Sequence, residues 1–169
     1  MSLIHIESLE KCFGDIKAID NISFQVYEGE VFGLLGPNGA GKSTLISIIT
    51  TLLKPDKGEV IVGGNNIKTQ KNKVKKMIGL VPQDIALYPT LTAKENLAFW
   101  GKMYGMGGSK LKNRIDEVLD SVGLKDRANS KIETFSGGMK RRINIGAALL
   151  HQPKILIMDE PTVGIDPQS

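Results

Sequence analysis

Apolar and polar residues alternate along the first third of the chain, and this pattern predicts strands. Ile4–Ile6 and Ile22–Val26 alternate as half-buried strands do. Gly58–Gly64 adds a short β-branched run bracketed by glycines, which is typical of a third strand. The first third is therefore expected to be rich in strands.

Three apolar runs are short enough for strands of a parallel sheet. Val31–Leu35 predicts a buried strand, and a glycine-rich loop and a helix beginning at Lys42 follow it. That helix should stop near Lys54–Pro55, because proline disfavours helical angles in the residue before it. Ile78–Gln83 is interpreted as a short strand ending at a loop, and Ile155–Met158 as a buried parallel strand.

The pattern changes to helices from Thr92 to about Leu124, with Gly105–Gly108 as the break between them. This stretch is expected to form an inserted helical lobe. Ser136 then precedes Met139–Leu150, a good helix former with a serine N-cap. Its first turn has open backbone donors, so it is a candidate anion-binding helix terminus.

Composition limits the classes of protein that the chain can belong to. Its 169 residues suit one domain with a sizeable core, and the net charge of +4 favours anionic ligands only weakly. No aromatic residues interleave the densest lysine run, so no nucleic-acid partner is expected. A solvated helix face explains that run best, with contact to acidic lipid headgroups or a partner as the alternative. The run comprises Lys68, Lys71, Lys73, Lys75 and Lys76.

Cysteine use and hydropathy indicate a reducing compartment and no bilayer span. The single cysteine, Cys12, cannot form an intrachain disulfide. Glu7, Glu10 and Lys11 interrupt any apolar leader, and no 18 apolar residues run uninterrupted. We therefore expect any membrane association to depend on a partner.

The loop after Val31–Leu35 carries the most informative motif of the chain. Gly36–Ser43 fits GxxxxGK[ST], in which glycines let successive N–H groups turn around phosphate oxygens. Lys42 can reach the β and γ phosphates, and the Ser43 hydroxyl can ligate Mg²⁺. The alternative is a chance glycine-rich turn, but the order of strand, loop and helix favours nucleotide binding.

An acidic pair follows the last apolar run, where the carboxyl end of a parallel strand faces ligands. Asp159 can hold Mg²⁺ directly or through water, and Glu160 can polarise a water for attack on the γ phosphate. The alternative is an ordinary surface acidic pair. The four apolar residues before it favour the functional interpretation.

Taken in order, these segments resemble the ATPase subunits of ABC transporters over the whole chain. The matching segments are Gly36–Ser43 (Walker A), Gln83 (Q-loop), Phe135–Met139 (signature), Ile155–Glu160 (Walker B) and Val163–Asp166 (D-loop). The residues of the signature and of the segment after Asp159 look most like those of the multidrug and antibiotic exporter branch.

The resemblance implies an α/β fold with a P-loop NTPase (RecA-like) core, an N-terminal antiparallel β subdomain and an inserted α-helical subdomain. The whole of 1–169 would be one ABC ATPase domain, incomplete at its C-terminus. Residues 1–83 and 152–169 would form the core with the β subdomain, and 84–151 the helical and signature subdomain.

The resemblance also implies the roles of individual residues, with ATP and Mg²⁺ as cofactors. Glu160, Lys42 and Gln83 would be catalytic, and Ser43, Gln83 and Asp159 would hold the metal. Ser136, Gly137 and Gly138 would contact ATP on a second copy, and Asp166 would act in the D-loop. The nucleotide-binding set would be Phe13, Gly36, Pro37, Asn38, Gly39, Ala40, Gly41, Lys42, Ser43 and Thr44. For Phe13, packing in the core is the alternative to stacking on adenine.

The implied function is ATP hydrolysis that powers a membrane exporter through head-to-tail dimerisation of two ATPase subunits. The partners would be a second ATPase subunit and transmembrane permease subunits, which would hold the protein on the cytoplasmic face of the membrane. The alternatives are a soluble nucleotide switch of the same superfamily acting on ribosomes or DNA, and an inert binding domain. The intact Lys42, Asp159 and Glu160 argue against the inert domain.

The chain departs from the family at two points. Met139 replaces the commonest glutamine of the signature but leaves Ser136–Gly138 intact. The family's switch histidine follows the D-loop, whereas His5 and His151 both precede Asp159. We therefore expect a chain that lacks the last core strands, binds ATP weakly and hydrolyses it poorly.

Overall fold

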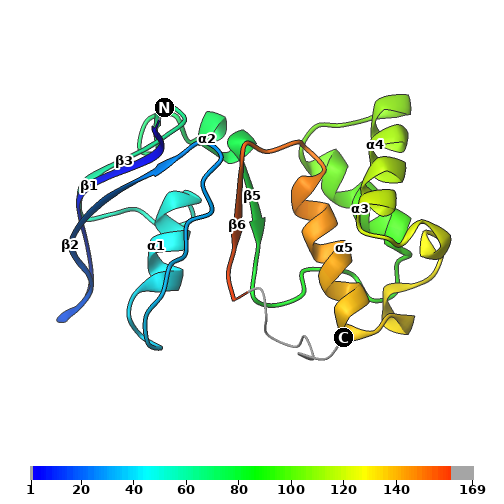
Figure 1. Ribbon diagram of the computed structural model, residues 1–169, viewed down its shortest axis with the longest axis horizontal. Coiled ribbons are helices and arrows are strands. Elements are labelled where there is room, and N and C mark those ends of the chain that lie inside the picture. Colours follow the sequence, from blue (N-terminus) through cyan, green and yellow to red (C-terminus); the bar gives the residue numbers. More distant parts are fainter. Residues whose placement is uncertain (1, 161–169) are drawn as a thin grey trace. The chain divides into compact units, whose positions relative to one another are not determined.

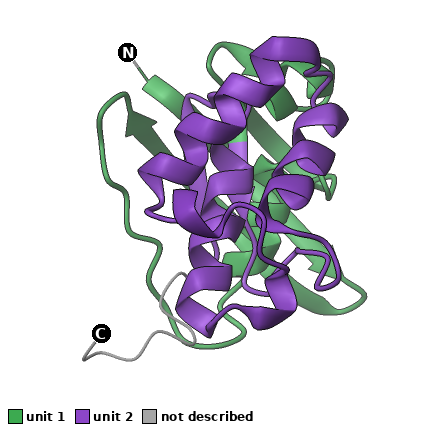
Figure 2. Ribbon diagram, turned by 90° about the vertical axis from the view of Figure 1, so that its right-hand side faces the viewer, with its two compact units in different colours: residues 1–78 green, residues 79–169 purple. Residues whose placement is uncertain are grey.

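The computed structural model describes residues 2–160, and they divide into two compact units (Figures 1 and 2). Of the described residues, 2–78 form the first unit and 79–160 the second. The division expected from the sequence, with boundaries at residues 83 and 152 between the core and the helical subdomain, stays a prediction.

Unit 1 is built on an antiparallel sheet with the strand order β2-β1-β3-β4. β1 (Ser2–Phe13) and β2 (Ile16–Tyr27) form a long hairpin, and β3 (Lys57–Val62) pairs with the other edge of β1. The short β4 (Asn65–Asn66) completes the sheet. The alternating patterns of the sequence thus predicted the first three strands, because one face of each is buried.

Two helices belong to unit 1, α1 (Lys42–Ile49) and α2 (Lys71–Met77). The sequence placed the end of α1 near Lys54–Pro55, and this was wrong. Thr51 takes a left-handed conformation with φ 65°, which cannot continue a right-handed helix. The amides of Leu52 and Leu53 both donate to the carbonyl of Ser47 and close the helix there.

The expectation of a buried strand at Val31–Leu35 was also wrong. The segment has no regular structure, and the side chains of Val31 and Leu35 are 100% and 93% exposed. An apolar run becomes a strand only where a neighbouring strand accepts its hydrogen bonds. None of the described strands of unit 1 pairs with it.

Unit 2 combines a two-stranded sheet with a helical lobe. β5 (Ile78–Val81), whose first residue closes unit 1, pairs with β6 (Ile155–Met158), and Figure 1 shows the two strands running in the same direction. The burial expected for β6 holds only at Ile155, and Met158 is 39% exposed. The physical reason is that β5 is its one neighbour among the described strands.

The helical lobe contains α3 (Ala93–Met103), α4 (Gly108–Ser121), α5 (Gly137–Leu149) and two 3₁₀ turns, η1 (Lys125–Arg127) and η2 (Ile132–Thr134). α3 begins with a capping box between Thr92 and Glu95. A break follows at residues 104–107, so the break predicted at Gly105–Gly108 is confirmed except that Gly108 is already the first residue of α4. The core of the lobe is formed by buried residues that include Leu97, Leu119, Ile132, Ile143 and Leu150.

Candidate functional site

The glycine-rich loop of unit 1 leads directly into α1. Gly41 is the N-cap residue, with φ 83°, and no side chain caps the helix. The first turn of a helix leaves backbone N–H groups without intrahelical partners, and these groups carry a partial positive charge. The start of α1 is therefore chemically suited to a phosphate group.

Gly41 fixes the loop against the β hairpin. A Cβ atom at this position would lie 2.1 Å from the carbonyl oxygen of Ala18 on β2, so only glycine fits. Phe13 lies at the turn end of the same hairpin, opposite Ile16, and is 50% exposed. The exposed ring therefore belongs to the element that supports the phosphate loop, with the Lys11 ammonium 5.5 Å from its centroid.

The side chain of Lys42 folds back over its own loop. Its Nζ donates hydrogen bonds to the carbonyl oxygens of Gly36 and Pro37, at 2.7 and 2.9 Å. The ammonium group is thus held within the loop that the glycines form. A phosphate bound there would meet both the ammonium and the amides at the start of α1.

The signature segment of unit 2 forms a second helix terminus. The Ser136 hydroxyl accepts a hydrogen bond from the Met139 amide at 3.3 Å, which confirms the predicted N-cap of α5. Ser136, Gly137 and Gly138 are all exposed, whereas Phe135 before them is buried beneath Arg127. This end of α5 is anchored by the core and open to an external ligand.

The acidic pair follows β6, as the sequence predicted. Asp159 donates its amide to the carbonyl of Val81 at the end of β5, at 3.0 Å. Gln83 lies two residues beyond Val81 and is exposed, so unit 2 brings the glutamine and the two acids to the same end of this sheet. Glu160 has φ 47°, a left-handed conformation that is unfavourable for residues other than glycine.

Arg141 of α5 holds this end of the sheet together, and the sequence analysis missed it. Its side chain is only 4% exposed. Nη1 donates to the carbonyl oxygens of Pro82 and Gln83, at 2.6 and 3.1 Å, and Nη2 to those of Asp159 and Glu160, both at 3.2 Å. No signal in the sequence indicated its burial, because Arg141 stands in a run with Lys140 and Arg142 that is typical of a solvated helix face.

The oxygen donors expected to hold Mg²⁺ suit that ion chemically. The Ser43 hydroxyl is exposed, the Asp159 carboxylate is partly exposed, and neither is engaged by a described hydrogen bond or ion pair. Mg²⁺ prefers hard oxygen ligands and keeps several waters, so one hydroxyl and one carboxylate fit it. Ser43 belongs to unit 1 and Asp159 to unit 2. Asp166 lies outside the described residues.

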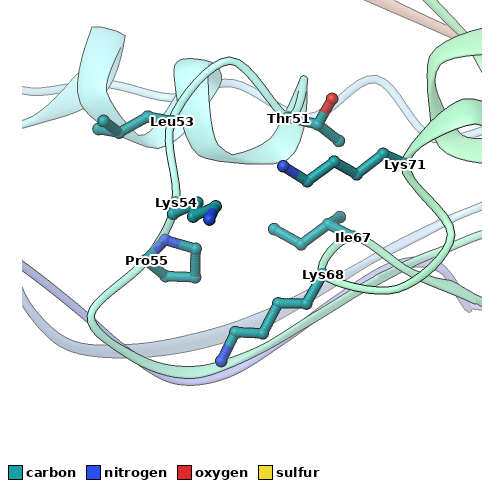
Figure 3. A pocket seen from close by; sticks show the side chains of 7 residues that line it. All are labelled: Thr51, Leu53, Lys54, Pro55, Ile67, Lys68 and Lys71. Carbon is teal, nitrogen blue, oxygen red and sulfur yellow. The ribbon is translucent and has the colours of Figure 1, made fainter.

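A separate hollow of about 320 Å³ lies at the other end of α1 (Figure 3). Because a helix rises about 1.5 Å per residue, the hollow is roughly 12 Å from Lys42 and takes no part in the phosphate loop. Lys73, Lys75 and Lys76 of α2 are exposed, which suits both a solvated face and contact with an acidic partner, whereas Lys71 is half-buried. The hollow is lined by Thr51, Leu53, Lys54, Pro55, Ile67, Lys68 and Lys71.

Comparison with known proteins gives one consistent picture. The sequence profile of the family described as ABC transporter matches residues 19–163. The chain is 61% identical to the linearmycin resistance ATP-binding protein LnrL of Bacillus subtilis (strain 168), covering 99% of this chain and 54% of LnrL. It is 39% identical to the daunorubicin resistance ATP-binding protein DrrA3 of Streptomyces coeruleorubidus, covering 98% of this chain and 52% of that protein.

Solved structures of ABC transporter subunits agree with the sequence relatives and confirm the predicted P-loop NTPase fold. The fold matches cbiO1 from Clostridium perfringens, part of the ABC transporter complex cbiONQ, with a TM-score of 0.89 and 30% identity. That match covers 99% of this chain and 68% of cbiO1. The chain spans about half the length of the curated relatives it matches. No helix within residues 2–160 has the length and apolar character that crossing a membrane requires.

Proposed function

The chain belongs to the ABC transporter family, and from this premise we propose that it is the ATP-binding and ATP-hydrolysing part of a membrane exporter. The observation that carries the proposal is the start of α1, where an uncapped helix terminus and the Lys42 ammonium share one glycine loop. Both groups favour a multiply charged anion, and a nucleoside triphosphate is the anion that this motif takes.

Each site residue then has a defined role. Residues Gly36 to Thr44 surround the phosphates, Lys42 neutralises the β and γ groups, and Phe13 stacks on the adenine. Ser43 and Asp159 would hold Mg²⁺, with Gln83 as a further ligand, and a bound ion would supply positive charge next to the phosphates. Glu160 accepts the proton of the attacking water.

We further propose a head-to-tail homodimer. The exposed start of α5 supports this, because Ser136, Gly137 and Gly138 are available to a phosphate held by a second copy. Each charge-assisted hydrogen bond formed there is worth about 1.5–3 kcal/mol, so several formed only with ATP would close the dimer. Hydrolysis would release it.

The permease partners and the location follow from the same proposal. Transmembrane subunits would select the cargo and hold the ATPase on the cytoplasmic face of the membrane. The names of LnrL and DrrA3 refer to resistance to linearmycin and daunorubicin, which supports an antibiotic-like cargo. Co-purification of the full-length protein with a membrane subunit is the expected result, and exclusive recovery with ribosomes or DNA would overturn the exporter assignment.

The test of catalysis is Glu160→Gln in the full-length protein. It should lower ATP turnover by about a hundredfold or more and leave the Kd for ATP unchanged, because a general base is lost without loss of phosphate contacts. Glu133→Gln is the matched control, since Glu133 is an exposed acid of the same unit that pairs with Lys131. Undiminished turnover in Glu160→Gln would assign the base to another residue.

A further inference from the structure

The guanidinium of Arg141 connects three segments to which the proposed function gives separate roles. It projects from α5, five residues after Ser136 of the signature, and bonds to the carbonyls of Pro82 and Gln83 on one side. On its other side it bonds to the carbonyls of Asp159 and Glu160. All of these residues belong to unit 2.

From this geometry we infer that Arg141 is a positioning residue, which holds Gln83 and Glu160 in one fixed arrangement and couples both to the signature helix. The inference rests on the proposed function of Glu160 as general base. The four hydrogen bonds of Arg141 all go to backbone carbonyl oxygens and none to the side chains of Gln83 or Glu160. It acts on the backbone that carries the two reactive side chains.

The shape of the guanidinium explains why arginine is required. Its planar fork directs two Nη atoms to two chain segments at once, whereas the lysine ammonium is a single point with no such span. Nε is buried and has no acceptor among residues 2–160. The side chain therefore leaves one donor unsatisfied while it reaches both segments, which indicates that the four carbonyl contacts determine its position.

Glu160 is the residue most dependent on this contact. Its φ of 47° is a conformation that persists only where surrounding groups fix it, and the Arg141 Nη2 bond to its carbonyl is such a group. Loss of that bond would let Glu160 return to an ordinary backbone conformation. Its carboxylate would then point in another direction.

The experiment compares Arg141→Lys and Arg141→Gln with Arg142→Gln in the full-length protein. Arg142 is the matched control, because it is the next residue of α5, is exposed, and donates one bond to the Val122 carbonyl. Both Arg141 variants should lose at least tenfold in kcat with a change in KM of less than about twofold. Arg142→Gln should stay within about twofold of the parent in both constants.

A readout without turnover separates positioning from a general folding defect. In Arg141→Lys the Asp159 amide, which donates to Val81, should exchange its hydrogen roughly tenfold faster, while amides of α3 and α4 exchange as in the parent. Adding Arg141→Lys to Glu160→Gln should cause a smaller further loss of kcat than Arg141→Lys causes in the parent, because the carboxylate that Arg141 positions is then already absent.

Three results would overturn the inference: an unchanged kcat in Arg141→Lys, faster exchange throughout unit 2, or a kcat loss that multiplies with that of Glu160→Gln. Failure of the proposed function would look different. In that case Glu160→Gln alone would leave turnover intact, whatever the Arg141 variants did.

Discussion

Replacing Gly41 with alanine tests how the phosphate loop is seated. At φ 83° an alanine pays the cost of a left-handed conformation, about 1–2 kcal/mol. Its Cβ would also lie 2.1 Å from the Ala18 carbonyl oxygen, a backbone atom that cannot rotate away. Relieving such a contact typically costs about 1–3 kcal/mol, so Gly41→Ala should lower the free energy of unfolding by about 2–5 kcal/mol.

Gly39 supplies a matched control within the same loop. Its φ is 82°, almost equal to that of Gly41, but a Cβ atom there would have no neighbour within 4 Å. Gly39→Ala should therefore lower the free energy of unfolding only by the cost of the left-handed conformation, about 1–2 kcal/mol. The difference between the two variants isolates the contact between the loop and β2.

The assay is urea unfolding of both variants without nucleotide, followed by circular dichroism, with the midpoint and slope compared with the parent. Omitting nucleotide keeps loop stability apart from ligand binding. Equal losses in the two variants would show that Gly41 is not packed against Ala18, and the seating of the loop on the hairpin would be refuted.

Further predictions concern the cap of α3 and two carboxylates. Thr92→Ala should destabilise α3 by about 1 kcal/mol in thermal unfolding, while Thr92→Ser should not. Thr92→Ala should also raise the pKa of Glu95, because the Thr92 backbone amide and then the Thr92 hydroxyl hold that pKa below its ordinary value. An NMR titration that found no rise would contradict this. The pKa of Asp56 is lowered, first by the Cys12 amide and then by Lys11. Its stabilisation is present at neutral pH and should be lost as pH falls below the ordinary aspartate pKa of 3.8 and through the lowered pKa. Unfolding midpoints should therefore fall less in Asp56→Asn as the solution is acidified, and parallel curves would exclude the effect.

Local signals predicted much of the fold. The predicted Ser136 cap places the start of α5 correctly, because N-caps act through neighbours in the sequence. The change of pattern at Thr92 likewise marks the start of α3. The glycine loop before Lys42 was identified for the same reason. The spacing of its glycines is visible in one short segment of the sequence. The contact of Gly41 with Ala18 is visible only in the folded structure.

Features that depend on distant partners could not be predicted in this way. Val31–Leu35 has the composition of a buried strand, but pairing decides whether a strand forms, and composition does not reveal the pairing. Arg141 stands in a run with Lys140 and Arg142, which is typical of a solvated surface. Its burial follows from the approach of Pro82 and Glu160, which lie far from it in the sequence.

The way α5 is fastened has a mechanical consequence. Arg141 secures it near its start, and at its far end Arg114 of α4 donates to the carbonyls of Leu149 and Leu150, at 2.8 and 3.1 Å. Because both ends of α5 are hydrogen-bonded to neighbouring segments, we expect the helix to move as a rigid body when its start is displaced. A displacement imposed at Ser136 should therefore be passed to the segment of the two acids and to α4 together.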